Sequence, residues 1–265
     1  MDAIFLTSPD ALHLEHAEIA FRCGKPVLCE KPMAMNAAEC ERIIAASKHA
    51  SKLLGVAHVM RFEESVNVAR EWVESGALGD VLHAYAEFTY PGYGSPRTWI
   101  TDASLAAGGP TADVGVHCFD TLRYILQQEV TSVFASMHQD ERSGSVEANA
   151  SMGLEFSGGV MADVFVSTRA PYRTGLEIIG SKRTLESRYC FYVDGPVDVA
   201  LVEEQREVQR VRCDNSRVYG VQFDAFSEAL EGGRPFPCSG EDGLKNQCII
   251  AGAYESARTG QKIRL

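Results

Sequence analysis

Three short apolar runs separated by helical segments open the chain, and this alternation constrains the fold more than any other feature. The runs cover residues 3–6, 27–29 and 53–57. Asn36, with Glu39 three residues later, is typical of a helix start, and Gly24 ends the preceding helix. Connections of this length predict parallel strands with right-handed crossovers. Ligands bind outside the carboxyl ends of such strands, so we expect a ligand rim that includes Ser8, Glu30, Lys31 and His58.

The periodicity of the sequence changes after His58. Apolar positions at helical spacing continue up to Gly76, which closes one more helix. From Val81 apolar and polar residues alternate, and the same alternation returns over residues 148–156 and 160–166. Several such strands without intervening helices predict an antiparallel sheet that is covered on one face.

Helices are expected to cover this sheet and to complete the chain. A helix over residues 112–127 can supply the cover. In the N-terminal segment, Ser8 is expected to cap the first helix and Pro9 to occupy its first position. The remaining expected elements are two helices and a short final strand, over residues 222–230, 243–257 and 262–265.

Composition excludes several classes of function. The 265 residues are 45% hydrophobic, which supports a real core, and the net charge of −11 argues against a nucleic-acid surface. The eight cysteines form no C-x-x-C pair, which fits reduced thiols in a cytoplasm. No signal peptide or membrane span is expected. The H-E-x-x-H, G-x-S-x-G and P-loop motifs are absent, so we expect neither a metal site nor a hydrolase.

Two motifs carry residues that are suited to chemistry. Glu30-Lys31-Pro32 ends the second apolar run, where a simple turn needs no charges. Asp113 and His117 are four residues apart on an expected helix, so they share a face. A carboxylate beside an imidazole suits deprotonation of a hydroxyl group. Taken singly, each motif is more often a surface pair or a packed core histidine, but their combination in this order favours a catalytic site.

The combined motifs resemble those of the Gfo/Idh/MocA family of nicotinamide-dependent oxidoreductases. The resemblance runs over nearly the whole chain and includes "DAIFLTSPDALHLEHA", "GKPVLCEKPMA", "GGPTADVGVHCFDTLRYIL" and "SGEDGLKNQCIIAGAYESARTGQKIRL". It implies a fold of class α/β plus α+β. Residues 1–58 would be the remnant of an N-terminally truncated, dinucleotide-binding Rossmann domain. Residues 59–265 would form an α+β domain for substrate binding and oligomerisation, with a large, mainly antiparallel sheet covered by helices.

The resemblance also implies roles for single residues. Lys31 is expected to donate a hydrogen bond to the reacting oxygen, His117 to act as general acid and base, and Asp113 to orient His117 or to bind substrate. Arg61 and Trp99 are looser matches to substrate-binding positions, with ordinary packing or a surface ion pair as the alternative. The cofactor, NAD or NADP, is expected to contact Thr7, Ser8, Pro9, His13, Glu30, Lys31 and Pro32.

One part of the family pattern is absent from the sequence. There is no G-x-G-x-x-G, since Arg97 follows Gly92-Tyr93-Gly94 where the third glycine would be, and the acidic residue for the adenosine ribose is missing too. We therefore expect neither a pyrophosphate cradle nor an adenosine pocket, and an edge strand over residues 3–6. There are three alternative explanations. The first methionine is internal to a longer protein, the chain is a natural truncation that pairs its edge with another chain, or another element of this chain covers the edge.

Two hypotheses for function follow. The first is an oxidoreductase that transfers a hydride between NAD(P) and a hydroxyl carbon of a sugar, inositol or related polyol. The alternative is a catalytically silent binding or assembly protein that has lost dinucleotide binding. Lys31, Asp113 and His117 favour the first, and the missing glycines favour the second. The resemblance also implies a homodimer or homotetramer.

Overall fold

The N-terminal part of the chain folds into a small parallel sheet, as expected. The computed structural model describes residues 1–265 and contains β1 (Ile4–Leu6), β2 (Val27–Cys29) and β3 (Leu54–Val56), in the order β1-β2-β3. Both strand pairs are parallel, and the helices α1 (His13–Arg22) and α2 (Ala37–Ala50) connect them. β1 is therefore an edge strand, and its residue Phe5 is 38% exposed.

The two connecting helices begin differently. Asn36 caps α2, because its side-chain oxygen accepts a hydrogen bond from the Glu39 backbone N–H at 3.0 Å. At the first helix the expected Ser8 cap is wrong: the chain enters through Pro9 and a 3₁₀ turn, Asp10–Leu12, before α1. The Ser8 hydroxyl instead hydrogen-bonds to His16 Nδ1 at 3.0 Å. That hydroxyl is therefore engaged further along α1 and does not satisfy the free N–H groups at the helix start.

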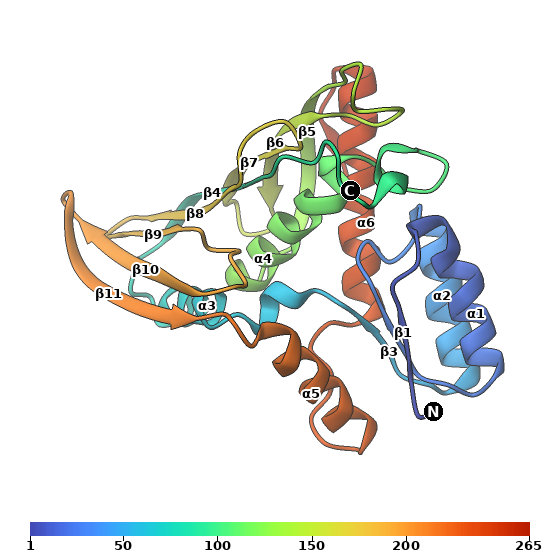
Figure 1. The fold of residues 1–265 in the computed structure, drawn as a ribbon. Helices are drawn as coiled ribbons and strands as arrows, with labels where there is room; N and C mark the ends of the chain where they lie inside the picture. The colour runs from blue at the N-terminus through green and yellow to red at the C-terminus, as the bar shows by residue number, and fades with distance from the viewer.

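A sheet of nine strands forms the larger part of the molecule (Figure 1). Its strands are β4 (Val81–Thr89), β5 (Val130–His138), β6 (Asn149–Phe156), β7 (Met161–Ser167), β8 (Arg173–Gly180), β9 (Thr184–Arg188), β10 (Pro196–Glu203), β11 (Arg206–Asp214) and β12 (Ile263–Arg264). Their order is β11-β10-β9-β8-β4-β7-β6-β5-β12, and every neighbouring pair except β4 and β7 is antiparallel. The mainly antiparallel sheet is thus confirmed.

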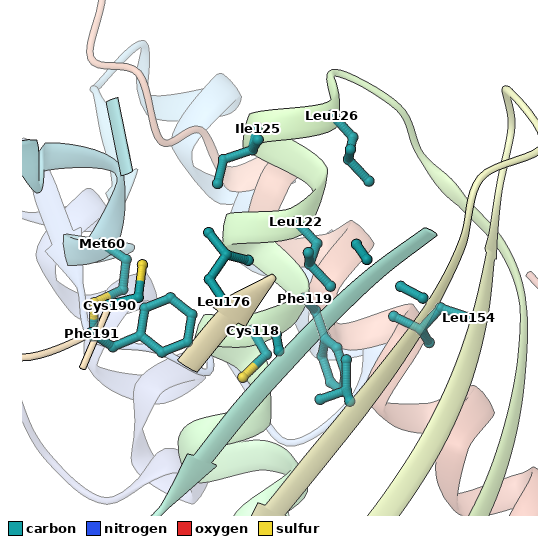
Figure 2. Packing of buried hydrophobic residues seen from close by; sticks show 14 of the residues in the cluster. Met60, Cys118, Phe119, Leu122, Ile125, Leu126, Leu154, Leu176, Cys190 and Phe191 are labelled. Carbon is teal, nitrogen blue, oxygen red and sulfur yellow. The ribbon is translucent and has the colours of Figure 1, made fainter. Parts of the chain in front are cut away.

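The helix expected over residues 112–127 covers one face of this sheet. It begins as a π-helical turn, Thr111–Gly115, and continues as α4 (Val116–Leu126). Phe119 and Leu122 of α4 are fully buried in one hydrophobic cluster with sheet residues such as Leu154 (Figure 2). Burying a side chain of this size stabilises the fold by about 1.5–3 kcal/mol. The covering helix is therefore confirmed, with a first turn that the sequence does not reveal.

The C-terminal helix α6 (Gly240–Thr259) packs against both parts of the molecule. It contacts β5 of the large sheet, and it contacts α2 and β3 beside the small one (Figure 1). Gly243 permits this close approach, because a Cβ there would lie 3.0 Å from Val56 Cγ2. Helix α3 (Glu64–Glu74) packs on α4 and on the β10–β11 pair. In α5 (Val218–Leu230), Phe223 contacts Phe5 of β1 edge to face, with ring centroids 5.2 Å apart.

Two further expectations concern the chain as a whole. The division into domains of residues 1–58 and 59–265 stays a prediction. Side chains from both ranges share one small hydrophobic cluster, in which Leu28 and Ala57 pack with Phe226 and Phe236. Among the helices, none combines the length and the apolar composition that a membrane crossing requires.

Candidate active site

A cavity of about 550 Å³ opens at the carboxyl ends of β1 and β2. On the side of the small sheet it is lined by Thr7, Ser8, Glu30, Lys31 and Pro32. Its other walls come from β4 and the loop after it, from the π-helical turn and from α4. The cavity therefore lies where a ligand was expected, and segments far apart in the sequence contribute to it.

Lys31 joins the two sides of this cavity. Its Nζ donates hydrogen bonds to the Asp113 carbonyl oxygen at 2.6 Å and to Asp113 Oδ1 at 3.1 Å. The Lys31 side chain is 12% exposed, and the Lys31–Pro32 peptide bond is cis. An ammonium group has three N–H donors, so one of them stays available to a ligand.

Asp113 lies at the centre of a hydrogen-bond network. Its Oδ1 accepts from Lys31 and Arg97, and its Oδ2 accepts from the Tyr90 hydroxyl at 2.5 Å and from Arg97 at 3.3 Å. Burial raises the pKa of this carboxyl, but Lys31 and Arg97 outweigh burial and hold the pKa well below its usual range. Asp113 is therefore ionised, and these donors fill its roughly four acceptor positions.

His117 also lines the cavity, but not as the hydrogen-bonded partner of Asp113. The Asp113 oxygens accept their hydrogen bonds from Lys31, Tyr90 and Arg97, and the expected role of Asp113 in orienting His117 or binding substrate stays a prediction. Asp113 lies in the π-helical turn, whose residues do not follow the α-helical spacing that the sequence expectation assumed. The imidazole instead stacks on Phe88, with ring centroids 5.9 Å apart.

The protonation state of His117 follows from its surroundings. Burial and the positive charge of Lys31 lower the pKa of His117 well below its usual value. The ring is therefore neutral at neutral pH and able to accept a proton. Its Nδ1 is enclosed without a hydrogen-bond partner, so Nε2 is the nitrogen that opens to the cavity.

Two of the residues expected to contact the cofactor do not line the cavity. His13 is completely buried, and its ring nitrogens hydrogen-bond to the carbonyl oxygens of Ser8 at 2.9 Å and Pro32 at 3.1 Å. It therefore joins the loops after β1 and β2, and its expected contact with the cofactor stays a prediction. Pro9 forms the N-terminal boundary of the 3₁₀ turn and also stays out of the cavity wall.

Arg61 does not line the cavity, and the expectation that it binds substrate stays a prediction. Its guanidinium is buried and donates to both oxygens of Asp120, at 2.8 and 2.6 Å, and to Asp242 at 2.9 Å. The side chain of His58, expected on the ligand rim, is buried in the same region, where it pairs with Asn246 at 3.0 Å. Trp99 does line the cavity.

The cavity also contains residues that the sequence patterns did not single out. Tyr90 ends the alternating run of β4, which was a usable signal. Arg97 lies in a loop, and Tyr172 and Tyr219 follow β7 and β11 at a distance, so only the fold brings them here. Asp10 accepts a hydrogen bond from the Ala107 backbone N–H at 2.9 Å, and burial raises its pKa to about 7.

Family profiles match both parts of the chain. Residues 1–58 match the profile described as an oxidoreductase family with NAD-binding Rossmann fold. Residues 66–186 match that of the GFO/IDH/MocA C-terminal domain. Together the two ranges cover more than half of the 265 residues.

Individual proteins match over nearly the whole chain. It is 28% identical to a 1,5-anhydro-D-fructose reductase of Ensifer adhaerens, over 98% of this chain and 79% of that protein. It is also 28% identical to a myo-inositol 2-dehydrogenase of Thermotoga maritima, over 100% of this chain and 80% of that protein. The crystal structure of an aldose-aldose oxidoreductase from Caulobacter crescentus complexed with glycerol matches with a TM-score of 0.91 and 28% identity, covering 100% of this chain and 79% of that one. None of these matches supports the alternative of a silent assembly protein.

Proposed function

Because the chain belongs to the Gfo/Idh/MocA family of oxidoreductases, we propose that it transfers a hydride between NAD or NADP and a hydroxyl-bearing carbon of a sugar, an inositol or a related polyol. The names of the relatives support this substrate class. One observation carries the proposal: Lys31 and His117 present an ammonium donor and a neutral imidazole to a single cavity. Oxidation of an alcohol needs a group that accepts the hydroxyl proton and a charge that stabilises the oxygen as it loses that proton.

The rim at the ends of β1 and β2 fits the nicotinamide end of the cofactor. A carboxamide needs one donor and one acceptor, and the Thr7 hydroxyl and the Glu30 carboxyl supply both from this rim. Ser8 and Pro32 complete the wall that would hold the ring. A bound nicotinamide supplies the acceptor for the hydride that leaves the substrate carbon.

Lys31 stabilises the developing charge on the substrate oxygen. Two of its N–H groups are engaged by Asp113, which fixes the direction of the third. A positive charge fixed in advance in an enclosed site is worth more than the same charge in water, because it needs no reorganisation during the reaction. Lys31 therefore acts on the oxygen, and Asp113 acts through Lys31 as a positioning residue.

His117 accepts the hydroxyl proton at Nε2 during oxidation and returns it during reduction. The lowered pKa keeps the ring neutral, so the base is present in its active form at neutral pH. The carboxylate of Asp113 gains a free acceptor for a substrate hydroxyl only where Arg97 moves away. Arg97 is suited to this exchange, because its two bonds to Asp113 are long, at 3.3 Å, and its side chain is 48% exposed.

The proposal also covers the cellular compartment and the oligomeric state of the protein. All eight cysteines are free thiols, which fits a reducing cytoplasm. A homodimer or homotetramer would use the uncovered face of the large sheet, where Phe134, Met161 and Ile179 are each at least 37% exposed. Sedimentation velocity of the full chain measures this assembly directly, and a monomer at micromolar concentration would contradict it.

Fluorescence titration with NADH and NADPH, followed by oxidation assays, tests the proposed function. We expect saturable binding of at least one nucleotide below millimolar concentration. We also expect formation of reduced nicotinamide with at least one member of a panel of aldoses, inositols and alkyl glycosides. No binding up to millimolar nucleotide would contradict catalysis by this chain.

A further inference from the structure

A second cavity, of about 350 Å³, opens from the first and is called the annex here. Both cavities are lined by Lys31 and His117, together with Glu30, Phe88, Tyr172 and Tyr219. The two groups proposed to act on the reacting bond therefore stand at the junction of the two spaces. A substituent carried near the reacting carbon has direct access to the annex.

The walls that belong to the annex alone are mostly apolar and aromatic. They come from the residues after β3 and from the turn before β10, and comprise Ala57, Val59, Met60, Phe191, Tyr192 and Val193, with Asp194 at the rim. Tyr172 contacts Phe88 and Tyr192 edge to face, at centroid distances of 6.0 and 6.2 Å. Phe191 stacks on Phe88 at 5.9 Å. One wall of the annex is thus a set of aromatic rings that contact one another.

Most of the groups proposed to hold the nicotinamide and the polar ring of the substrate line the first cavity alone. Thr7, Ser8, Arg97 and Asp113 do so, whereas Glu30 lines both cavities at their junction. The aromatic part of the annex is therefore left for a part of the substrate that neither set of residues holds. A space of this size is within the range of small-molecule sites.

The chemistry of the annex favours a ring with an apolar face and a polar edge. Aromatic faces bind the C–H surface of a sugar ring or the face of an aryl ring. The hydroxyls of Tyr192 and Tyr219 make no hydrogen bond within the protein and remain free at the edge, beside the exposed carboxylate of Asp194. A simple monosaccharide or inositol has no second ring to place there.

We propose that the physiological substrate is a glycoside whose second ring binds in the annex on Tyr172 and Tyr192. This inference rests on the proposed function in one respect, which is that the reacting carbon lies between Lys31 and His117. The annex then selects substrates by what is attached to the oxidised sugar, while the first cavity selects the sugar itself.

Calorimetric titration of the full chain tests this inference. The ligands are matched methyl and phenyl pyranosides of glucose, galactose, mannose and xylose, in both anomers, and each is titrated with and without NADH. The phenyl group serves as the probe for a second ring. At least one phenyl glycoside should bind about tenfold more tightly than its methyl counterpart. Equal affinities within every pair, or no binding of any glycoside, would overturn the proposal.

Tyr192→Ala tests the site itself, because Tyr192 lines the annex and not the first cavity. The variant should bring the phenyl-to-methyl affinity ratio close to one. Tyr189→Ala is the matched control, since Tyr189 is 55% exposed and lies outside both cavities, and it should leave the ratio unchanged. A ratio that Tyr192→Ala does not lower would overturn the annex as the binding site.

The binding readout separates this inference from the proposed function. Preferential binding of phenyl glycosides without any hydride transfer would support the annex and contradict the oxidoreductase activity. Hydride transfer to NAD or NADP with no preference for a second ring would support the activity and overturn the annex.

Discussion

Lys31 acts on the protonation of two ionisable side chains in the cavity, Asp113 and His117. Its charge works against burial at Asp113 and lowers the pKa of that carboxyl. At His117 the same charge adds to burial, and the pKa of the imidazole falls as well. Lys31 and Arg97 thus keep the carboxylate charged, while burial and Lys31 keep the histidine neutral, which is the combination that a positioning acid and a catalytic base require.

Replacing His117 tests the catalytic base. His117→Ala should lower kcat by roughly two to four orders of magnitude, because the proton acceptor is removed while the remaining cavity wall is kept. Steady-state kinetics with the best substrate measures the loss, and circular dichroism checks the fold. His83→Ala is the control, since His83 lies on β4 outside the cavity. Unchanged turnover in His117→Ala would remove His117 from the mechanism.

Asp10 makes the stability of the fold depend on pH. Burial raises its pKa from 3.8 to about 7. A group that binds its proton more tightly in the folded state contributes fully below pH 3.8, and the contribution is lost as pH rises through about 7. The loss is at most roughly 4 kcal/mol.

Asp10→Asn should therefore flatten the pH dependence of unfolding between about pH 4 and 7, because the amide keeps an acceptor for Ala107 and does not ionise. Urea unfolding at a series of pH values measures the slope in the wild type and in the variant. Asp80→Asn, at an exposed position, is the control. Identical slopes in the wild type and in Asp10→Asn would refute the assignment.

Among the secondary-structure elements, the π-helical turn before α4 decides how the site is arranged. The carboxylate of Glu147 holds its start by accepting hydrogen bonds from the N–H groups of Gly109 at 3.0 Å and Thr111 at 2.8 Å. The Tyr254 hydroxyl donates to the same carboxylate at 2.6 Å. This clamp fixes the turn that presents Asp113 to Lys31.

Removing the clamp should destabilise the protein. Glu147→Ala leaves the Thr111 N–H without a partner and the Tyr254 O–H without its acceptor, at a cost of about 1–3 kcal/mol for each, while the Gly109 N–H keeps the Tyr254 hydroxyl oxygen as acceptor. Chemical denaturation should show a loss of about 2–4 kcal/mol, allowing for partial solvation. The exposed Glu231→Ala should change stability by less than about 0.5 kcal/mol. A Glu147→Ala variant as stable as the wild type would show that the clamp is not needed.

The elements that the sequence predicts well are those with local signals. The cap at Asn36 and the alternation along β4 both depend on residues that are close in the sequence, and both are confirmed. The π-helical turn has no such signal, so the sequence did not predict the wider turn that carries Asp113. The buried ion pair of Arg61 was not foreseen for a related reason: its partner Asp120 is 59 residues away, and no pattern in the sequence reports that pairing.

At the scale of the whole molecule, the cavity exists because the small sheet is tied to the segment that follows β4. Lys31 bonds to Asp113, the Asp10 carboxyl accepts from Ala107, and the Ala11 N–H donates to the Leu105 carbonyl at 3.1 Å. Lys31 and Asp113 are 82 residues apart in the sequence, so the pair forms only when both parts are folded and docked. The active site is therefore a property of the complete fold.

The central claim is that Lys31 and His117 act on one bond in one cavity. A double-mutant cycle on kcat for Lys31→Ala and His117→Ala tests this claim most directly. Each single variant should lose roughly two to four orders of magnitude in turnover. The double variant should lose little more than the worse of the two, because groups that act as a unit are strongly non-additive. Losses that simply multiply, or single variants with full activity, would contradict the account.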